Sequence, residues 1–217
     1  MFHIIGPAQH ESCSAILDDM YRKRYDVVVK QWGWDIPGIR DGYDKDQFDT
    51  DETVYIVVTD GDKGVVASTR LNPTTSPHML SELFSDYCNL QQFPVADNIW
   101  ECSRYVINRS FYNDPLLEFR IRARLGIGIT QHCVEENITH LSWLTHQRFY
   151  NVAQRVWETE PLGLPRRDTA DGWAWIPAVS KIDASTLQRQ RDRFENSEEV
   201  VLEFTSGKNS KPSDRAA

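Results

Sequence analysis

The sequence lacks the signatures of several common protein classes. No apolar run reaches the ~18 residues of a membrane-spanning helix, and the first residues lack the basic start and long apolar core of a signal peptide. The four cysteines form no Cys-x-x-Cys pair, and the six histidines form no His-Glu-x-x-His pair. We therefore expect no membrane span, zinc site, disulfide framework or permanently bound cofactor, and a cytoplasmic location.

Basic residues are also scarce. Lysine and arginine number 24 against 32 aspartate and glutamate residues, which gives a net charge of −8. This balance argues against nucleic acid or an anionic membrane as the main partner. The chain has no Gly-x-Ser-x-Gly motif, and Ser103 has no histidine close to it in sequence, so serine hydrolase chemistry is disfavoured.

The composition is that of a globular protein. Hydrophobic residues make up 40% of the 217 residues, and the mean hydropathy is −0.52. No linker or internal repeat divides the chain. We expect one domain over residues 1–205 and a disordered polar tail over residues 206–217.

Local patterns predict alternating strands and helices. Strands are expected at residues 1–6, 54–59, 65–71, 98–107, 138–145, 171–177 and 198–204, and helices at residues 8–30, 77–84, 115–137, 147–157 and 182–193. Strand 98–107, the following helix and the next strand form a predicted parallel crossover. The fold class is therefore α/β (α+β): a single-domain, three-layer α-β-α arrangement around a mixed central sheet.

The strand at residues 98–107 carries two charges. Glu101 and Arg104 are three residues apart, and strict pleating would place their side chains on opposite faces of the sheet. One interpretation is an edge strand with two surface charges. The other is a β-bulge that brings both side chains into one cleft.

An acidic segment follows two tryptophans in the first quarter of the chain. Trp32 and Trp34 lie among glycines and prolines and precede the run Asp44-Lys45-Asp46-Gln47-Phe48-Asp49. Several aspartates in one loop repel one another unless water or cations compensate them. The segment is either a mobile acidic loop or a lid whose aromatic and acidic side chains hold a ligand.

Four sequence fragments, in order, resemble those of the N-acyl-homoserine lactone synthases, the bacterial quorum-sensing autoinducer synthases. They are Arg24 with Trp34; Asp46-Gln47-Phe48-Asp49; Arg70-Leu71-x-Pro73-Thr74-x-x-Pro77-x-Met79-Leu80; and Trp100-Glu101-x-Ser103-Arg104. The resemblance implies the fold of the GCN5-related acyltransferases. It also implies acylation of the amine of S-adenosylmethionine by an acyl thioester, followed by lactonisation and release of methylthioadenosine.

The resemblance assigns expected roles to these residues. Glu101 is the candidate general base, acting through a water, and Ser103 and Arg104 complete the catalytic set. The residues expected to bind S-adenosylmethionine or to hold the lid are Arg24, Trp34, Asp46, Asp49 and Arg70. An ion pair between Asp46 and Arg104 is expected to fasten the lid to the sheet.

The acyl group is expected between the strand at residues 100–107 and the strand at residues 141–145. Candidate wall residues are Met79, Phe84, Tyr105, Ser142, Trp143 and Thr145. If Trp143 points into the pocket, its bulk favours a short, branched or aromatic acyl group. Such groups commonly travel as coenzyme A thioesters, so acyl-CoA is the favoured donor, with acyl-carrier protein as the other candidate.

Two other functions stay open at this stage. One is a GCN5-like N-acyltransferase that modifies another amine and forms no lactone. The other is a non-catalytic acyltransferase-like module that binds a ligand without turnover. Release of methylthioadenosine separates the lactone synthase from both.

Overall fold

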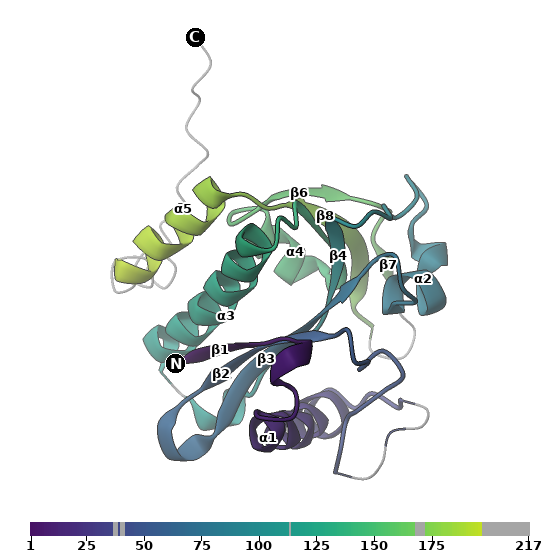
Figure 1. The fold of residues 1–217 in the computed structure, drawn as a ribbon. Helices are drawn as coiled ribbons and strands as arrows, with labels where there is room; N and C mark the ends of the chain where they lie inside the picture. The colour runs from purple at the N-terminus through teal and green to yellow at the C-terminus, as the bar shows by residue number, and fades with distance from the viewer. Residues whose placement is uncertain (37–38, 40–41, 113, 168–171, 197–217) are drawn as a thin grey trace.

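The computed structural model describes residues 1–36, 39, 42–112, 114–167 and 172–196, and these form one eight-stranded sheet with helices on both faces (Figure 1). The strand order is β1-β2-β3-β4-β5-β8-β6, with β7 paired to β8. The strands are β1 (Phe2–Ile5), β2 (Val54–Thr59), β3 (Val65–Pro73), β4 (Ile99–Ile107), β5 (His140–His146), β6 (Glu158–Pro161), β7 (Arg166–Arg167) and β8 (Ala174–Lys181).

Five α-helices connect and cover these strands. They are α1 (Ser14–Tyr25), α2 (Met79–Leu83), α3 (Pro115–Glu135), α4 (Gln147–Ala153) and α5 (Ala184–Glu195). A π-helical segment, Asp26–Gln31, extends α1. The predicted hairpin of β2 and β3 and the predicted helices at α3 and α5 are confirmed.

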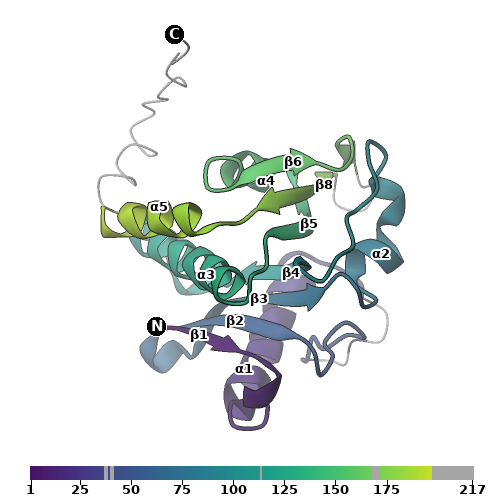
Figure 2. The same ribbon diagram turned by 45° about the horizontal axis from the view of Figure 1, so that its top comes forward.

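Two hydrophobic clusters hold the layers together. On one face, Ile121 and Leu125 of α3 pack with Ile56 of β2, and α5 lies against α3. On the other face, Met20 of α1 packs with Val57 of β2, the neighbour of Ile56 that points the opposite way. Figures 1 and 2 show α1 and α3 on opposite sides of β1–β3. The predicted three-layer α-β-α arrangement is confirmed.

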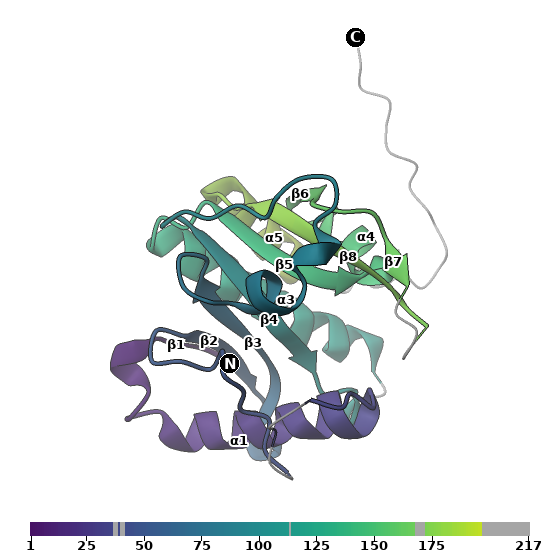
Figure 3. The same ribbon diagram turned by 90° about the vertical axis from the view of Figure 1, so that its right-hand side faces the viewer.

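β4 and β5 form the only parallel pair among the described strands, joined by the predicted crossover through α3. Their pairing covers three positions, from Ile99 opposite His140 to Glu101 opposite Ser142. Beyond Glu101 the two strands diverge. Helix α2 contacts both strands (Figure 3).

Several predicted boundaries were wrong. The helix expected at residues 8–30 begins as an α-helix only at Ser14, and the strand expected at residues 65–71 extends to Pro73. The strand expected at residues 171–177 begins at Ala174.

The strand expected to stop at Pro177 continues through it to Lys181. The Pro177 carbonyl accepts from the Leu162 N–H, and Leu162 lies just past the end of β6. The N–H that proline lacks therefore costs the β6–β8 ladder no hydrogen bond. The helix expected at residues 147–157 ends at Ala153, because the chain then turns into β6, an edge strand that the sequence pattern did not predict.

The helix expected to begin at Pro77 begins instead at Met79, with His78 at its N-cap. The predicted strand at residues 198–204 and the predicted tail at residues 206–217 lie outside the described residues. None of the helices in the described ranges is long and apolar enough to cross a bilayer.

Candidate active site

A β-bulge in β4 places the predicted catalytic residues on one face of the sheet. Arg70 pairs with Ser103 and Ser68 pairs with Val106, so Thr69 of β3 lies opposite two residues of β4, Arg104 and Tyr105. Arg104 has a φ of 51°, in the left-handed region that few side chains adopt. The extra residue brings the Arg104 side chain to the face that carries Ser103, which is the α1 face.

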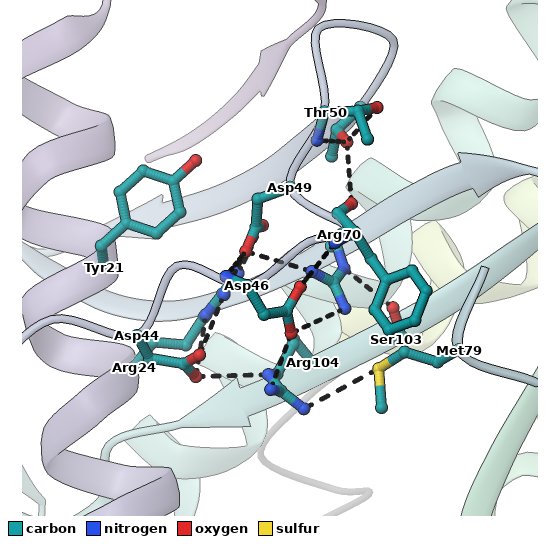
Figure 4. A network of polar contacts seen from close by, with 12 residues as sticks. Tyr21, Arg24, Asp44, Asp46, Asp49, Thr50, Arg70, Met79, Ser103 and Arg104 are labelled. Atoms are coloured by element: carbon teal, nitrogen blue, oxygen red, sulfur yellow. Dashed lines mark hydrogen bonds and ion pairs between the residues drawn. The ribbon is translucent and has the colours of Figure 1, made fainter. Parts of the chain in front are cut away.

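Three arginines and three aspartates form one buried network on that face (Figure 4). They are Arg24, Asp44, Asp46, Asp49, Arg70 and Arg104. Arg24 Nη2 lies 2.7 Å from Asp49 Oδ2, and Arg70 Nη1 lies 3.1 Å from the same oxygen. Arg104 Nη2 donates to Asp46 Oδ2 over 2.8 Å. The expected Asp46–Arg104 pair is therefore confirmed.

The six side chains of this network are at most 4% exposed. Burial alone would raise the pKa of the Asp49 carboxyl, but Arg24 and Arg70 hold that pKa well below its usual range. Burial opposes the charge of Arg24, yet Asp49 and Asp44 raise its pKa. For Arg104, burial lowers the pKa, and the attraction of Asp44 does not offset it.

The acidic segment is thus fixed to the sheet by mutually compensated charges. Asp46 and Asp49 each reach the sheet arginine Arg70, and Asp49 also reaches Arg24 of α1. These ion pairs disagree with the interpretation of the segment as a mobile loop, and its role as a lid that holds a ligand stays a prediction. Each predicted arginine already has a carboxylate partner, so a ligand would meet a network of near-zero net charge.

Glu101 is separate from this network. Its side chain is 2% exposed, and its two oxygens accept from the backbone of α2: Oε1 from the Leu80 N–H over 2.6 Å and Oε2 from the Met79 N–H over 3.2 Å. A carboxylate oxygen offers two lone pairs, so each oxygen retains capacity for a further donor. The carboxylate therefore fixes the start of α2 and remains able to accept from a bound water or amine.

Three more predicted residues lie on this face. The Ser103 hydroxyl accepts from Arg70 Nε over 3.0 Å, and Arg104 Nη1 lies 3.8 Å from the sulfur of Met79. Ser142 is paired with Glu101 and fully buried, so it lies beside the carboxylate across the β4–β5 ladder. Phe84, directly after α2, is half-buried, and its ring centroid lies 5.7 Å from that of Tyr87.

The remaining predicted wall residues lie on the α3 face. Trp143 is 7% exposed and is held by a 3.0 Å hydrogen bond from its Nε1 to the Ser180 hydroxyl. Trp143 and Thr145 share one face of β5, and Tyr105 shares the α3 face because the bulge ends just before it. The candidate residues therefore lie on both faces of the sheet, which the sequence pattern did not indicate.

Two aromatic residues that the sequence pattern did not single out border the same strands. Phe149 of α4 lies 4.8 Å from the ring of Tyr105 and 5.7 Å from that of Trp143, so it bridges the diverging β4 and β5. On the other face, Trp175 of β8 lies 5.4 Å from Trp34. Both residues are far in sequence from the motifs, and only their aromatic character was a signal.

Trp34 packs against the cluster formed by Val27, Val28 and Val106, close to the end of β4. It also contacts Trp32, which is 43% exposed. The described parts of the chain contain no group of three or more histidine, cysteine, aspartate or glutamate side chains placed to hold a metal ion.

Comparisons with known proteins agree with this arrangement. Residues 8–169 match the autoinducer synthase family. The chain is 30% identical over 200 residues to isovaleryl-homoserine lactone synthase of Bradyrhizobium diazoefficiens, an alignment that covers 89% of this chain and 85% of that protein. It is 28% identical to an acyl-homoserine-lactone synthase of Acinetobacter nosocomialis over 79% of this chain and 87% of that one.

Among solved structures, the chain is similar to BjaI, a CoA-dependent acyl-homoserine lactone synthase solved with SAM and isopentyl-CoA. The TM-score is 0.78 at 27% identity, over 90% of this chain and 89% of that chain. The predicted GCN5-related acyltransferase-like fold is confirmed. Taken with the buried network and the diverging strands, these matches show that this chain belongs to the autoinducer synthase family and is an acyl-homoserine-lactone synthase, an acyltransferase.

Proposed function

We propose that this enzyme transfers a short or branched acyl group from coenzyme A to the amine of S-adenosylmethionine and then closes the homoserine lactone. The amine attacks the thioester carbonyl, an N–C bond forms, and the C–S bond breaks to leave the coenzyme A thiolate, which takes up the amine proton. The carboxylate oxygen then attacks the γ-carbon, and methylthioadenosine leaves as a neutral thioether. Ring closure is intramolecular, which reduces its entropic barrier.

The diverging pair β4 and β5 carries this proposal. Beyond their last paired position, three aromatic rings, those of Tyr105, Trp143 and Phe149, lie together on the α3 face. Rings of this size beside a thioester site leave room for a small acyl group rather than a long chain. The name isovaleryl-homoserine lactone synthase and the isopentyl-CoA present in the BjaI structure both indicate a group of this small, branched kind in relatives.

Glu101 is the proposed general base, acting through one water. An α-amino group has a pKa near 8, so removal of its proton near pH 7 costs only about 1 kcal/mol, and a buried carboxylate suffices. The developing oxyanion requires donors, and backbone N–H groups at the bulge of Arg104 are the proposed source, worth about 3 kcal/mol. Ser103 and Arg104 then act by holding the bulge through Arg70 and Asp46.

The lid network is proposed to shape the S-adenosylmethionine site. Arg24, Arg70 and Asp49 fasten the acidic segment to the sheet, and Trp34 and Trp175 lie at the end of β4 where a sulfonium could contact an aromatic face. The roles of Phe84, Ser142 and Thr145 in the acyl site stay predictions. The same holds for the cytoplasmic location and for acyl-carrier protein as a second donor.

The test is incubation with S-adenosylmethionine and a panel of acyl-CoA and acyl-carrier donors, with methylthioadenosine release and product mass as readouts. We expect equimolar acyl-homoserine lactone, methylthioadenosine and free coenzyme A. Coenzyme A release without methylthioadenosine would indicate acylation of another amine. Binding of S-adenosylmethionine with no turnover of any donor would indicate a non-catalytic module.

A further inference from the structure

The indole of Trp143 is the first member of a series of hydrogen bonds that crosses three strands. Its Nε1–H donates to the Ser180 hydroxyl of β8 over 3.0 Å. Ser180 Oγ lies 2.8 Å from Thr159 Oγ1 of β6, and the Thr159 hydroxyl donates to the Trp157 carbonyl over 3.2 Å. These four groups form one hydrogen-bond chain, which runs from β5 to the edge strand β6.

The hydrogen-bond chain has a single direction. A hydroxyl carries one proton, and a carbonyl only accepts. Because the Thr159 proton goes to the Trp157 carbonyl, Ser180 donates to Thr159, and the Ser180 oxygen accepts from Trp143. Each hydroxyl therefore donates once and accepts once. Removal of either hydroxyl leaves a donor of the chain without its acceptor.

The register of the strands explains why the indole reaches Ser180. Trp143 of β5 is paired with Ala178 of β8, and Ser180 lies two residues further along β8, on the same face. Ala178 is small and fully buried, so the indole has room to lie across it toward its diagonal neighbour. Thr159 of β6 is paired directly with Ser180, which places the two hydroxyls side by side.

Two aromatic rings also pack edge-on beside the indole. The ring centroid of Trp143 lies 5.7 Å from that of Phe149 and 6.4 Å from that of Trp157. Trp157 is itself fixed, since its Nε1 donates to Thr130 of α3 over 3.2 Å. Trp143 is 7% exposed and Ser180 is 2% exposed, so water does not readily replace a partner that either of them loses.

We propose that Ser180 and Thr159 are positioning residues that determine acyl specificity by holding Trp143 in one orientation. The inference rests on the proposed function, since it takes Trp143 as a wall of the acyl site. Cys102 of β4 and Phe149 of α4 pack against the cluster that contains Trp143, so the indole lies beside the space where β4 and β5 diverge. A fixed wall excludes a longer acyl group by its shape, whereas a wall that changes rotamer makes room for it.

The first measurement is kcat/KM for acyl-CoA donors of increasing length in Ser180→Ala, Thr159→Val and the double variant. The quantity compared with the wild type is the ratio of kcat/KM for the preferred donor to that for its next longer homologues. Each single variant should lower this ratio about fivefold or more, since a fixed wall discriminates by about tenfold or more per methylene. Because both hydroxyls belong to one chain, the double variant should lower the ratio no further than the larger single effect.

Thr186→Val is the matched control for these variants. Thr186 is a 2% exposed threonine of α5 whose hydroxyl donates to Asp183, outside the hydrogen-bond chain. Its replacement also removes one buried, hydrogen-bonded hydroxyl, and it should leave the donor ratio unchanged.

The second measurement is hydrogen exchange of the indole N–H groups, followed by NMR of protein with isotope-labelled tryptophan and without substrate. The Trp143 signal is assigned by its absence from Trp143→Phe. We expect this signal to exchange about tenfold faster in Ser180→Ala and in Thr159→Val than in the wild type, as loss of one hydrogen bond implies.

An unchanged donor ratio in folded Ser180→Ala and Thr159→Val would overturn the inference. Fully additive effects in the double variant, or unchanged exchange of the Trp143 signal, would overturn it as well. Thermal unfolding shows which variants are folded, and if Ser180→Ala is not, the half-buried Thr159 of the edge strand decides the outcome through Thr159→Val. A wild type that turns over no acyl thioester would instead overturn the proposed function, while the exchange measurement would still test the hydrogen-bond chain.

Discussion

Glu101 and Arg104 lie three positions apart in one strand and yet on the same face of the sheet. The cause is the backbone at Arg104, whose φ of 51° opens a bulge opposite Thr69. Glu101 then fixes α2 above the strand, and Arg104 joins the lid through Asp46. Arg104 also lies 3.8 Å from the sulfur of Met79, so this one distorted residue links the lid to the helix that Glu101 holds.

The first prediction concerns Glu101→Gln. Glutamine replaces one carboxylate oxygen with an NH₂ donor, so in the same orientation one of the Met79 and Leu80 N–H groups would face a donor instead of an acceptor. We expect kcat to fall by ~10²–10⁴ because the general base is lost. Methylthioadenosine release measures turnover, and Glu82→Gln, on the exposed side of α2, is the control. Wild-type turnover in Glu101→Gln would remove Glu101 from the base role.

The second prediction concerns stability at acid pH. Because the folded state holds the pKa of Asp49 below its ordinary value of 3.8, Asp49 contributes stability that is present above that value and is lost as the pH falls below it. Asp49→Asn should flatten the decline of the unfolding free energy below about pH 4. It should also lower stability at neutral pH by about 3–5 kcal/mol, since Arg24 and Arg70 lose a buried partner.

Denaturant titrations from pH 2 to pH 7 check both effects. Asp26→Asn is the matched control, because the Asp26–Lys30 pair is exposed and its loss should cost at most about 1 kcal/mol. An unchanged acid slope in Asp49→Asn would show that other carboxyl groups govern acid unfolding.

The third prediction concerns the acyl group. Trp143→Ala should shift donor preference toward longer or bulkier acyl-CoA thioesters, because it opens space beside Phe149 between the diverging strands. Each added methylene changes discrimination by about 1–3 kcal/mol, so kcat/KM ratios across a donor series should change by roughly tenfold or more. Trp157→Phe is the control, since Trp157 lies behind Trp143 and donates to Thr130 of α3. An identical donor ranking would show that Trp143 does not line the pocket.

The fourth prediction compares two glycines of α3. A Cβ at Gly128 would lie 2.6 Å from Ile56 Cγ2 and 3.1 Å from the Phe2 ring, whereas a Cβ at Gly126 would meet only Gln190 Nε2 at 3.6 Å. Gly128→Ala should therefore destabilise the fold by about 1–3 kcal/mol. Gly126→Ala should be neutral or stabilising by up to ~1 kcal/mol, because alanine favours the helix. Thermal unfolding distinguishes the two, and equal effects would contradict the close packing of α3 on the sheet.

Much of the fold is encoded locally. Apolar periodicity and turn residues predict the β2–β3 hairpin, the crossover through α3 and the order of helices and strands. The family motifs identify the residues of the ion-pair network without knowledge of their contacts: Arg24, Asp46, Asp49, Arg70 and Arg104. The confirmed Asp46–Arg104 pair shows that a motif can predict a specific long-range contact. Edge strands β6 and β7 could not be predicted in this way, because their short sequences form strands only where β8 provides a partner.

The sequence alone determined which residue types the site contains and which two strands form the parallel crossover. The tertiary structure decided on which face of the sheet each side chain lies: the bulge at Arg104 placed the Arg104 side chain on the face of Glu101 and Ser103 and left Tyr105 facing Phe149 of α4. It also allowed Pro177 within β8 and brought Trp175 to Trp34. Periodicity reports only the local alternation of a strand. A single extra residue reverses that alternation, and its position depends on hydrogen bonds to a neighbouring strand that is distant in sequence.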